Sequence, residues 1–97
     1  MALTTQTHRL RKGINMETRV ALLGIIVEDT EEVEKLNRIL HDYAEYIIGR
    51  MGIPYNMKKM NVISIVMDAP ENQISALSGK IGMLKGITSK VIYGKKC

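Results

Sequence analysis

Residues 20–27 constrain the fold of this chain more than any other segment, because every one of them is apolar or glycine. Side chains of a β-strand point alternately to the two faces of a sheet, so a strand formed here is apolar on both faces. That pattern is typical of a central strand with both faces covered. Residues 62–69 show nearly the same pattern. We therefore expect one sheet with these two segments as its central strands.

Two apolar stripes at helical spacing lie between the extended segments and predict two amphipathic helices. Asp29 is suited to cap the first helix, with Glu32 three residues later, and Gly86 stands where the second helix should end. The first stripe comprises Val33, Leu36, Leu40, Tyr43, Ala44 and Ile47, and the second comprises Ile74, Leu77, Ile81 and Leu84.

Extended patterns at residues 48–55 and 87–93 complete the order β-α-β-β-α-β. Pro54 cannot donate to a ladder and so places its strand at a sheet edge. The order predicts an α+β, ferredoxin-like βαββαβ sandwich, a four-stranded antiparallel sheet with two helices on one face. Apolar side chains of both central strands then lie on the other face, which favours burial against another chain. We expect a homo-oligomer, either a dimer or a tetramer.

The 97 residues suffice for one domain, and most of the net charge of +4 comes from residues 1–15, which contain basic residues and no acid. Residues 16–97 carry 11 basic and 10 acidic side chains. We interpret residues 1–15 as a flexible basic N-terminal arm or an over-extended start before a second methionine, Met16. No segment has the length of a signal-peptide core or a membrane span, and a lone Cys97 forms no internal disulfide. We expect a cytoplasmic protein that does not contact a membrane.

No catalytic constellation stands out, so we expect neither an enzyme nor a cofactor. The histidines, His8 and His41, and Cys97 lack the spacing of metal ligands, and we expect no metal. Each histidine should be a lone exposed side chain. Without Trp or Phe, the sheet lacks an aromatic platform for RNA.

The segment Gly49-Arg50-Met51-Gly52 is the hardest to explain by core packing. Glycine in a strand interior costs about 0.5–1 kcal/mol relative to alanine, so two glycines three apart suggest unusual backbone angles or a close approach. The segment matches the GXXG loop of KH domains only formally, because it precedes a strand pattern and does not join two helices. Two interpretations remain open: a distorted edge strand without a ligand, and a contact with a small molecule or another subunit.

Polar residues of the first helix and of the turn before it are further candidates. Asn37 lies on the same helix side as Val33 and Ala44, so we expect a buried amide that bonds nearby backbone, or alternatively a ligand or a neighbouring chain. The acidic residues around Glu28 and Asp29 precede the helix, where its dipole favours negative charge, and capping explains them.

Four strings occur together: Asn37-x-Ile39-Leu40, Ile-Gly-Arg-Met-Gly-Ile-Pro at 48–54, Val-Ile-Ser-Ile-Val at 62–66 and Leu-Ser-Gly-Lys-Ile-Gly at 77–82. Over about residues 17–94 the chain thereby resembles the family of iron-only hydrogenase system regulators. That family is similar in fold to ACT domains and to the C-terminal domain of nickel-responsive regulators. The resemblance implies one ACT-like domain over residues 16–97 with a regulatory role. It does not extend to nickel sensing, because the histidine and cysteine ligands are absent here.

ACT domains hold a small effector, often an amino acid, at a subunit interface. Our leading hypothesis is that Arg50 binds the carboxylate of such an effector in an oligomer. The second is a ligand-free interaction module for a hydrogenase-maturation protein. The third is weak nucleic-acid binding through the basic arm, and any effect on transcription would need a partner. The resemblance places effector or interface candidates at Glu28, Asp29, Thr30, Gly49, Arg50, Met51 and Gly52, with Asn37 added from its place on the helix.

Overall fold

The computed structural model of the chain describes residues 17–95. The predictions for residues 1–15 and for Cys97 fall outside these residues. The strands are β1 (Arg19–Val27), β2 (Ile47–Tyr55), β3 (Met60–Ala69) and β4 (Ile87–Tyr93), and the helices are α2 (Val33–Asp42) and α3 (Glu71–Gly82). Short 3₁₀ turns occupy Thr30–Glu32, Ala44–Tyr46 and Asn56–Lys58.

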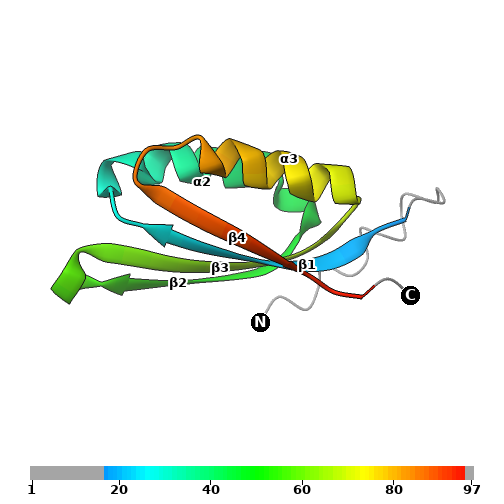
Figure 1. Cartoon of the computed structure of the whole chain (residues 1–97), viewed down its shortest axis with the longest axis horizontal. Coiled ribbons are helices and arrows are strands. Elements are labelled where there is room, and N and C mark those ends of the chain that lie inside the picture. Colours follow the sequence, from blue (N-terminus) through cyan, green and yellow to red (C-terminus); the bar gives the residue numbers. More distant parts are fainter. Residues whose placement is uncertain (1–16, 96–97) are drawn as a thin grey trace.

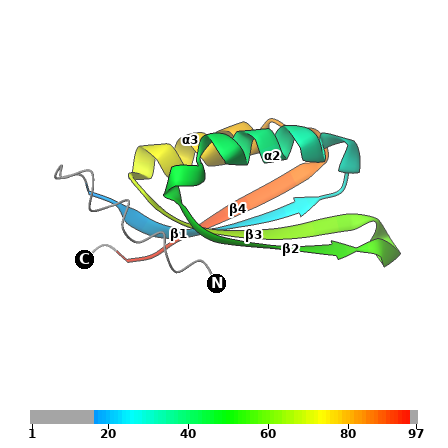
Figure 2. The same ribbon diagram turned by 180° about the vertical axis from the view of Figure 1, so that it is seen from behind.

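The predicted sandwich is confirmed. All four strands form one antiparallel sheet in the order β2-β3-β1-β4, with β1 and β3 in the centre. Both helices lie on the same face of this sheet, as the two opposite views show (Figure 1, Figure 2). Pro54 stands on the edge strand β2, where the missing amide hydrogen breaks no central ladder.

The edge strand β2 contains one irregularity. Its register with β3 shifts between Ile47, which is opposite Met67, and Gly49, which is opposite Val66. From Gly49 onward the register is unbroken as far as Tyr55, which is opposite Met60. Such a bulge gives one strand an additional residue relative to its partner.

The core lies between the sheet and the two helices. Alternate residues of the central strands, such as Leu23 and Ile65, are fully buried there, and so are the helix residues Leu36, Leu40 and Leu77. This alternation follows from the period of two along a strand and the helical spacing of the stripes.

Both helices end earlier than the sequence predicts. The second helix, α3, ends at Gly82, so Leu84 of the predicted stripe lies outside it, and Gly86 adopts its positive φ of 70° in the turn before β4. The first helix is shorter than its stripe predicts: α2 ends at Asp42, because Tyr43 has a φ of −110° and a 3₁₀ turn follows. Ile47, which the stripe assigned to the helix, begins β2 instead.

The sheet face opposite the helices is open and apolar. The central strands expose Val20, Leu22, Val62 and Val66 there to 51%, 39%, 37% and 36%. β1 is therefore apolar on both faces, as predicted, but among residues 17–95 only the helix side is covered. Neither helix among the described residues is long and apolar enough to cross a membrane.

Candidate functional site

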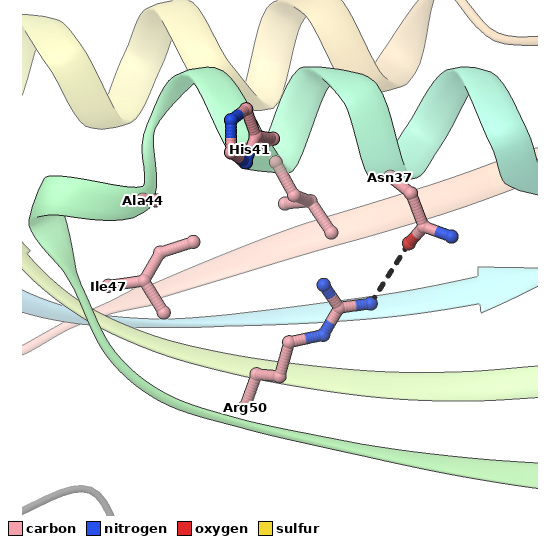
Figure 3. A pocket seen from close by; sticks show the side chains of 6 residues that line it. Asn37, His41, Ala44, Ile47 and Arg50 are labelled. Atoms are coloured by element: carbon pink, nitrogen blue, oxygen red, sulfur yellow. Dashed lines mark hydrogen bonds between the residues drawn. The ribbon is translucent and has the colours of Figure 1, made fainter.

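Arg50 lies on the side of β2 that faces the helices. Its cross-strand partner is Ile65, which is fully buried under the helices, and directly opposite residues share a face. The guanidinium group rises from β2 toward α2, where its Nη2 donates to Asn37 Oδ1 over 3.1 Å (Figure 3). Among the residues that the structure describes, this amide oxygen is the hydrogen-bond partner of Arg50.

The prediction that Asn37 is a buried amide is wrong. Its side chain is exposed and bonds the Arg50 side chain instead of nearby backbone. Helical spacing did place Asn37 on the sheet side of α2, but this part of the helix lies beside the edge strand, where nothing covers it. Two of the predicted candidates, Asn37 and Arg50, are thus brought together from separate elements.

Two shallow hollows lie on either side of this hydrogen bond, and we call them together the α2–β2 groove. They have volumes of about 280 Å³ and 270 Å³. The first is lined by Asn37, Leu40, His41, Ala44, Ile47 and Arg50, and the second by Val33, Asn37, Arg50, Gly52, Ile53, Pro54, Asn61 and Ile63. The groove therefore combines one guanidinium charge with apolar walls on both sides.

A third hollow lies on the open face of the sheet, over β2, β3 and β1. Its volume is about 390 Å³, and it is lined by Leu22, Gly49, Arg50, Met51, Ser64 and Val66. By their partners on β3, Gly49 and Met51 face the open side and Arg50 and Gly52 face the helix side, as the period of two requires, although Arg50 also lines this third hollow.

The two glycines of β2 do not have the unusual backbone that their spacing suggested. Among the described residues, Gly86 alone of the glycines has a positive φ. An added Cβ would meet nothing within 4 Å at Gly49, and at Gly52 only a side-chain carbon of Ile63 at 3.9 Å. Within the described part of the chain, neither a turn nor a close approach explains these glycines.

The candidates at the end of β1 lie apart from the groove. Asp29 Oδ1 accepts a hydrogen bond from the Glu31 amide over 3.0 Å, so Asp29 caps the 3₁₀ turn that leads into α2, whereas α2 itself begins after Glu32 without a side-chain cap. The amides of Glu28 and Asp29 both donate to the Gly86 carbonyl oxygen, over 2.8 Å and 3.3 Å. Together with Thr30 they line none of the three hollows described above. Their role as effector contacts stays a prediction.

His41 is a groove residue that sequence reasoning missed. The predicted exposure of His41 is confirmed, but the residue is not isolated, because it lines the same hollow as Asn37 and Arg50. The signal was present, because His41 follows Asn37 by four residues and such positions share a helix face. In the part of the chain that the structure describes, no three His, Cys, Asp or Glu side chains gather as a metal site. The polar residues that line the groove are Asn37, His41, Arg50 and Asn61.

Comparison with known proteins identifies relatives of the chain. Residues 19–91 match the model of the TM1266-like family, described as an iron-only hydrogenase system regulator, a role that the description itself treats as provisional. Among solved structures, uncharacterized protein TM1266 from Thermotoga maritima is 36% identical, with a TM-score of 0.78 over 81% of this chain and 100% of that one. No match was found among curated proteins.

Proposed function

The chain belongs to the TM1266-like family of iron-only hydrogenase system regulators, and from this membership we propose that it is a regulatory module that senses a small carboxylate effector. It acts in the cytoplasm as a homo-oligomeric, ACT-like domain and not as an enzyme. The effector binds at Arg50, close to a subunit interface.

The observation that carries this proposal is the state of the Arg50 guanidinium. It is exposed, and the partner that holds it is a neutral amide oxygen, so its positive charge remains available. A guanidinium presents its donors in a planar fork that matches the two oxygens of a carboxylate. Asn37 holds this fork between two hollows whose walls include Leu40 and Ile63. An effector with a carboxylate and a short apolar side chain suits this arrangement.

The open sheet face supports the oligomeric part of the proposal. Large contiguous apolar patches on soluble proteins mark interaction surfaces, and here the patch spans both central strands. Burial of one exposed valine or leucine stabilises an assembly by up to about 1.5–3 kcal/mol. A second subunit stacked on this face would also cover the hollow beside Met51 and Gly49.

A thermal-shift screen tests the effector. The purified protein is heated with the standard amino acids and with small mono- and dicarboxylates. An effector at about 100 times its Kd stabilises the folded state by about 2.7 kcal/mol. For a domain of this size the melting temperature should then rise by roughly 10–20 °C.

Two variants make the screen specific for Arg50. Arg50→Ala should abolish the shift, whereas Arg38→Ala should preserve it, because Arg38 is also exposed and its loss removes the same charge. The proposal is wrong if no compound shifts the melting temperature, or if the shift survives Arg50→Ala.

The open face also fits a second function, docking of a hydrogenase-maturation protein without any ligand. In that case Leu22→Lys would abolish co-purification of the partner while Arg50→Ala would not. The effector hypothesis predicts sensitivity to Arg50.

A further inference from the structure

We infer that two copies of the chain pair through their β2 edges, antiparallel and centred on Met51, so that both Arg50 side chains together bind one small dicarboxylate. The pairing is argued from the residues and the backbone of β2. The dicarboxylate part rests on the proposed function and narrows its effector to a class with two carboxylates.

The glycines of β2 supply the first argument, since nothing among residues 17–95 requires them. Neither has a positive φ, and a Cβ at either position has room. In an antiparallel pair centred on Met51, however, each glycine faces a large residue of the second copy. Arg50 is then opposite the partner's Gly52, and Ile53 is opposite the partner's Gly49. The side chains of residues 49–53 are therefore complementary in size to those of the same segment in a second, antiparallel copy.

The backbone of β2 supplies the second argument. N–H and C=O groups of alternate residues point to the same side of a strand. Pro54 has no N–H and is tolerated where that position faces solvent. Because the register is unbroken from Gly49 to Tyr55, Arg50 and Gly52 share the outward orientation of Pro54. Arg50 and the partner's Gly52 are then a hydrogen-bonded pair, while Met51 meets its own copy in the closer, non-hydrogen-bonded pair.

The β2 residues exposed on the open face of the sheet also agree with a pairing centred on Met51. Met51 and Ile53 are 59% and 51% exposed. Pairing centred on Met51 packs the two Met51 side chains against each other and lays Ile53 over a glycine. The open faces of the two sheets also join into one continuous surface.

The pairing has a consequence for charge on the helix side. The two Arg50 side chains lie on one face as diagonal neighbours, whose Cα atoms in a sheet are about 7–8 Å apart. The two guanidinium groups carry like charges and repel each other, and each has only the neutral Asn37 oxygen beside it among the described residues. A ligand with two carboxylates compensates both charges at once. Dimerisation and dicarboxylate binding should therefore strengthen each other.

Analytical ultracentrifugation tests the dicarboxylate, with succinate as the probe and sodium chloride of equal ionic strength as the control. We expect succinate to raise the dimer association constant by about tenfold or more. The gain should vanish in Arg50→Gln and persist in Arg38→Gln. An equal effect of both salts would overturn the dicarboxylate site.

Disulfide trapping without any ligand tests the pairing, so its result is independent of the effector screen. Met51→Cys and Ile53→Cys are each made with Cys97→Ser. In the inferred register the Cα atoms at position 51 of the two copies lie about 4.5–5.5 Å apart, within disulfide reach. The Cα atoms at position 53 of the two copies are offset by four residues, about 14 Å. We expect a linked dimer for Met51→Cys and none for Ile53→Cys.

Equal linkage at both positions, or none at Met51→Cys, would overturn the register. Gly52→Val provides a second measurement that does not depend on oxidation. A valine fits the single chain at this position but would lie against the partner's Arg50. It should weaken dimerisation by about tenfold or more while the circular dichroism spectrum stays unchanged. Unchanged dimerisation would contradict the pairing.

Discussion

Arg50 and Asn37 join the edge strand β2 to helix α2 through one hydrogen bond of 3.1 Å between Nη2 and Oδ1. Both side chains are exposed, so water competes for each of them. The bond therefore contributes little to the free energy of unfolding. Its effect is positional, because it holds the guanidinium group in the α2–β2 groove.

Replacing Asn37 by leucine should change the free energy of unfolding by less than about 1 kcal/mol, because an exposed hydrogen bond is lost and no buried group is left unpaired. Urea denaturation measures this change. The adjacent Leu36→Ala is the comparison, since Leu36 is fully buried and its truncation should cost about 2–5 kcal/mol. Equal losses for both variants would restore the idea of a structural Asn37.

Gly86→Ala should destabilise the fold by more than about 1–2 kcal/mol, the cost of the left-handed conformation alone. Gly86 has a φ of 70°, and a Cβ there would lie 2.5 Å from the Asp29 Cβ. Thermal unfolding checks this, with Gly79→Ala as the control. Gly79 lies within α3 with no atom within 4 Å of an added Cβ, so alanine should stabilise by about 0.5–1 kcal/mol.

Arg19→Ala should cost about 1–3 kcal/mol, because Arg19 joins the start of β1 to α3 and to the end of β4. Its guanidinium group donates to the Gly94 carbonyl oxygen over 2.8 Å, lies 3.3 Å from Glu71 and stacks 4.5 Å from the centre of the Tyr93 ring. Glu71→Gln should cost less than about 1 kcal/mol, since the Glu71 side chain is 53% exposed.

Hydrogen exchange locates the effect of Arg19. In Arg19→Ala the Gly94 amide, which donates to the Val20 carbonyl oxygen over 2.8 Å, should exchange faster. Amides in the middle of β3 should keep their protection. Uniform loss of protection would mean that Arg19 supports the whole fold and not its end.

Leu22→Lys should weaken assembly through the open face without unfolding the chain. Leu22 is 39% exposed on a central strand, so the lysine ammonium can reach water in the monomer but would be buried in a stacked pair. Static light scattering reports the mass at micromolar concentration. Ser75→Lys adds the same charge on exposed α3 and should leave the mass unchanged. A wild-type monomer under these conditions would exclude the oligomer.

The sequence predicted most of the fold because period and strand order are local properties. Any sandwich of this strand order buries one face of its central strands and one side of each helix, and leaves two strands at the edges. The alternation in β1 and β3, the apolar stripe of α3 and the position of Pro54 correspond to these requirements. The end of α2 could not be predicted, because neither glycine nor proline marks Tyr43. The backbone of Tyr43 is not helical, although the apolar stripe continues past it.

The site was harder to predict because exposure depends on how far a helix extends over a sheet. Spacing located Asn37 on the inner side of α2, but only the position of the helix beside the edge strand leaves it exposed and within reach of Arg50. His41 was missed although its place four residues after Asn37 puts it on the same side of α2. The groove has no local signature, since its residues come from two elements that meet only in the folded chain.

The bulge between Ile47 and Gly49 has a consequence for the lineage of this protein. The additional residue determines to which face of the sheet each later side chain of β2 points. In a chain one residue shorter here, each of these side chains would point to the opposite face. The arginine would then lie on the open apolar face, and the methionine beside it would lie beneath α2. Two homologues whose sequences differ only by the deletion of one residue here would therefore expose opposite sets of β2 side chains.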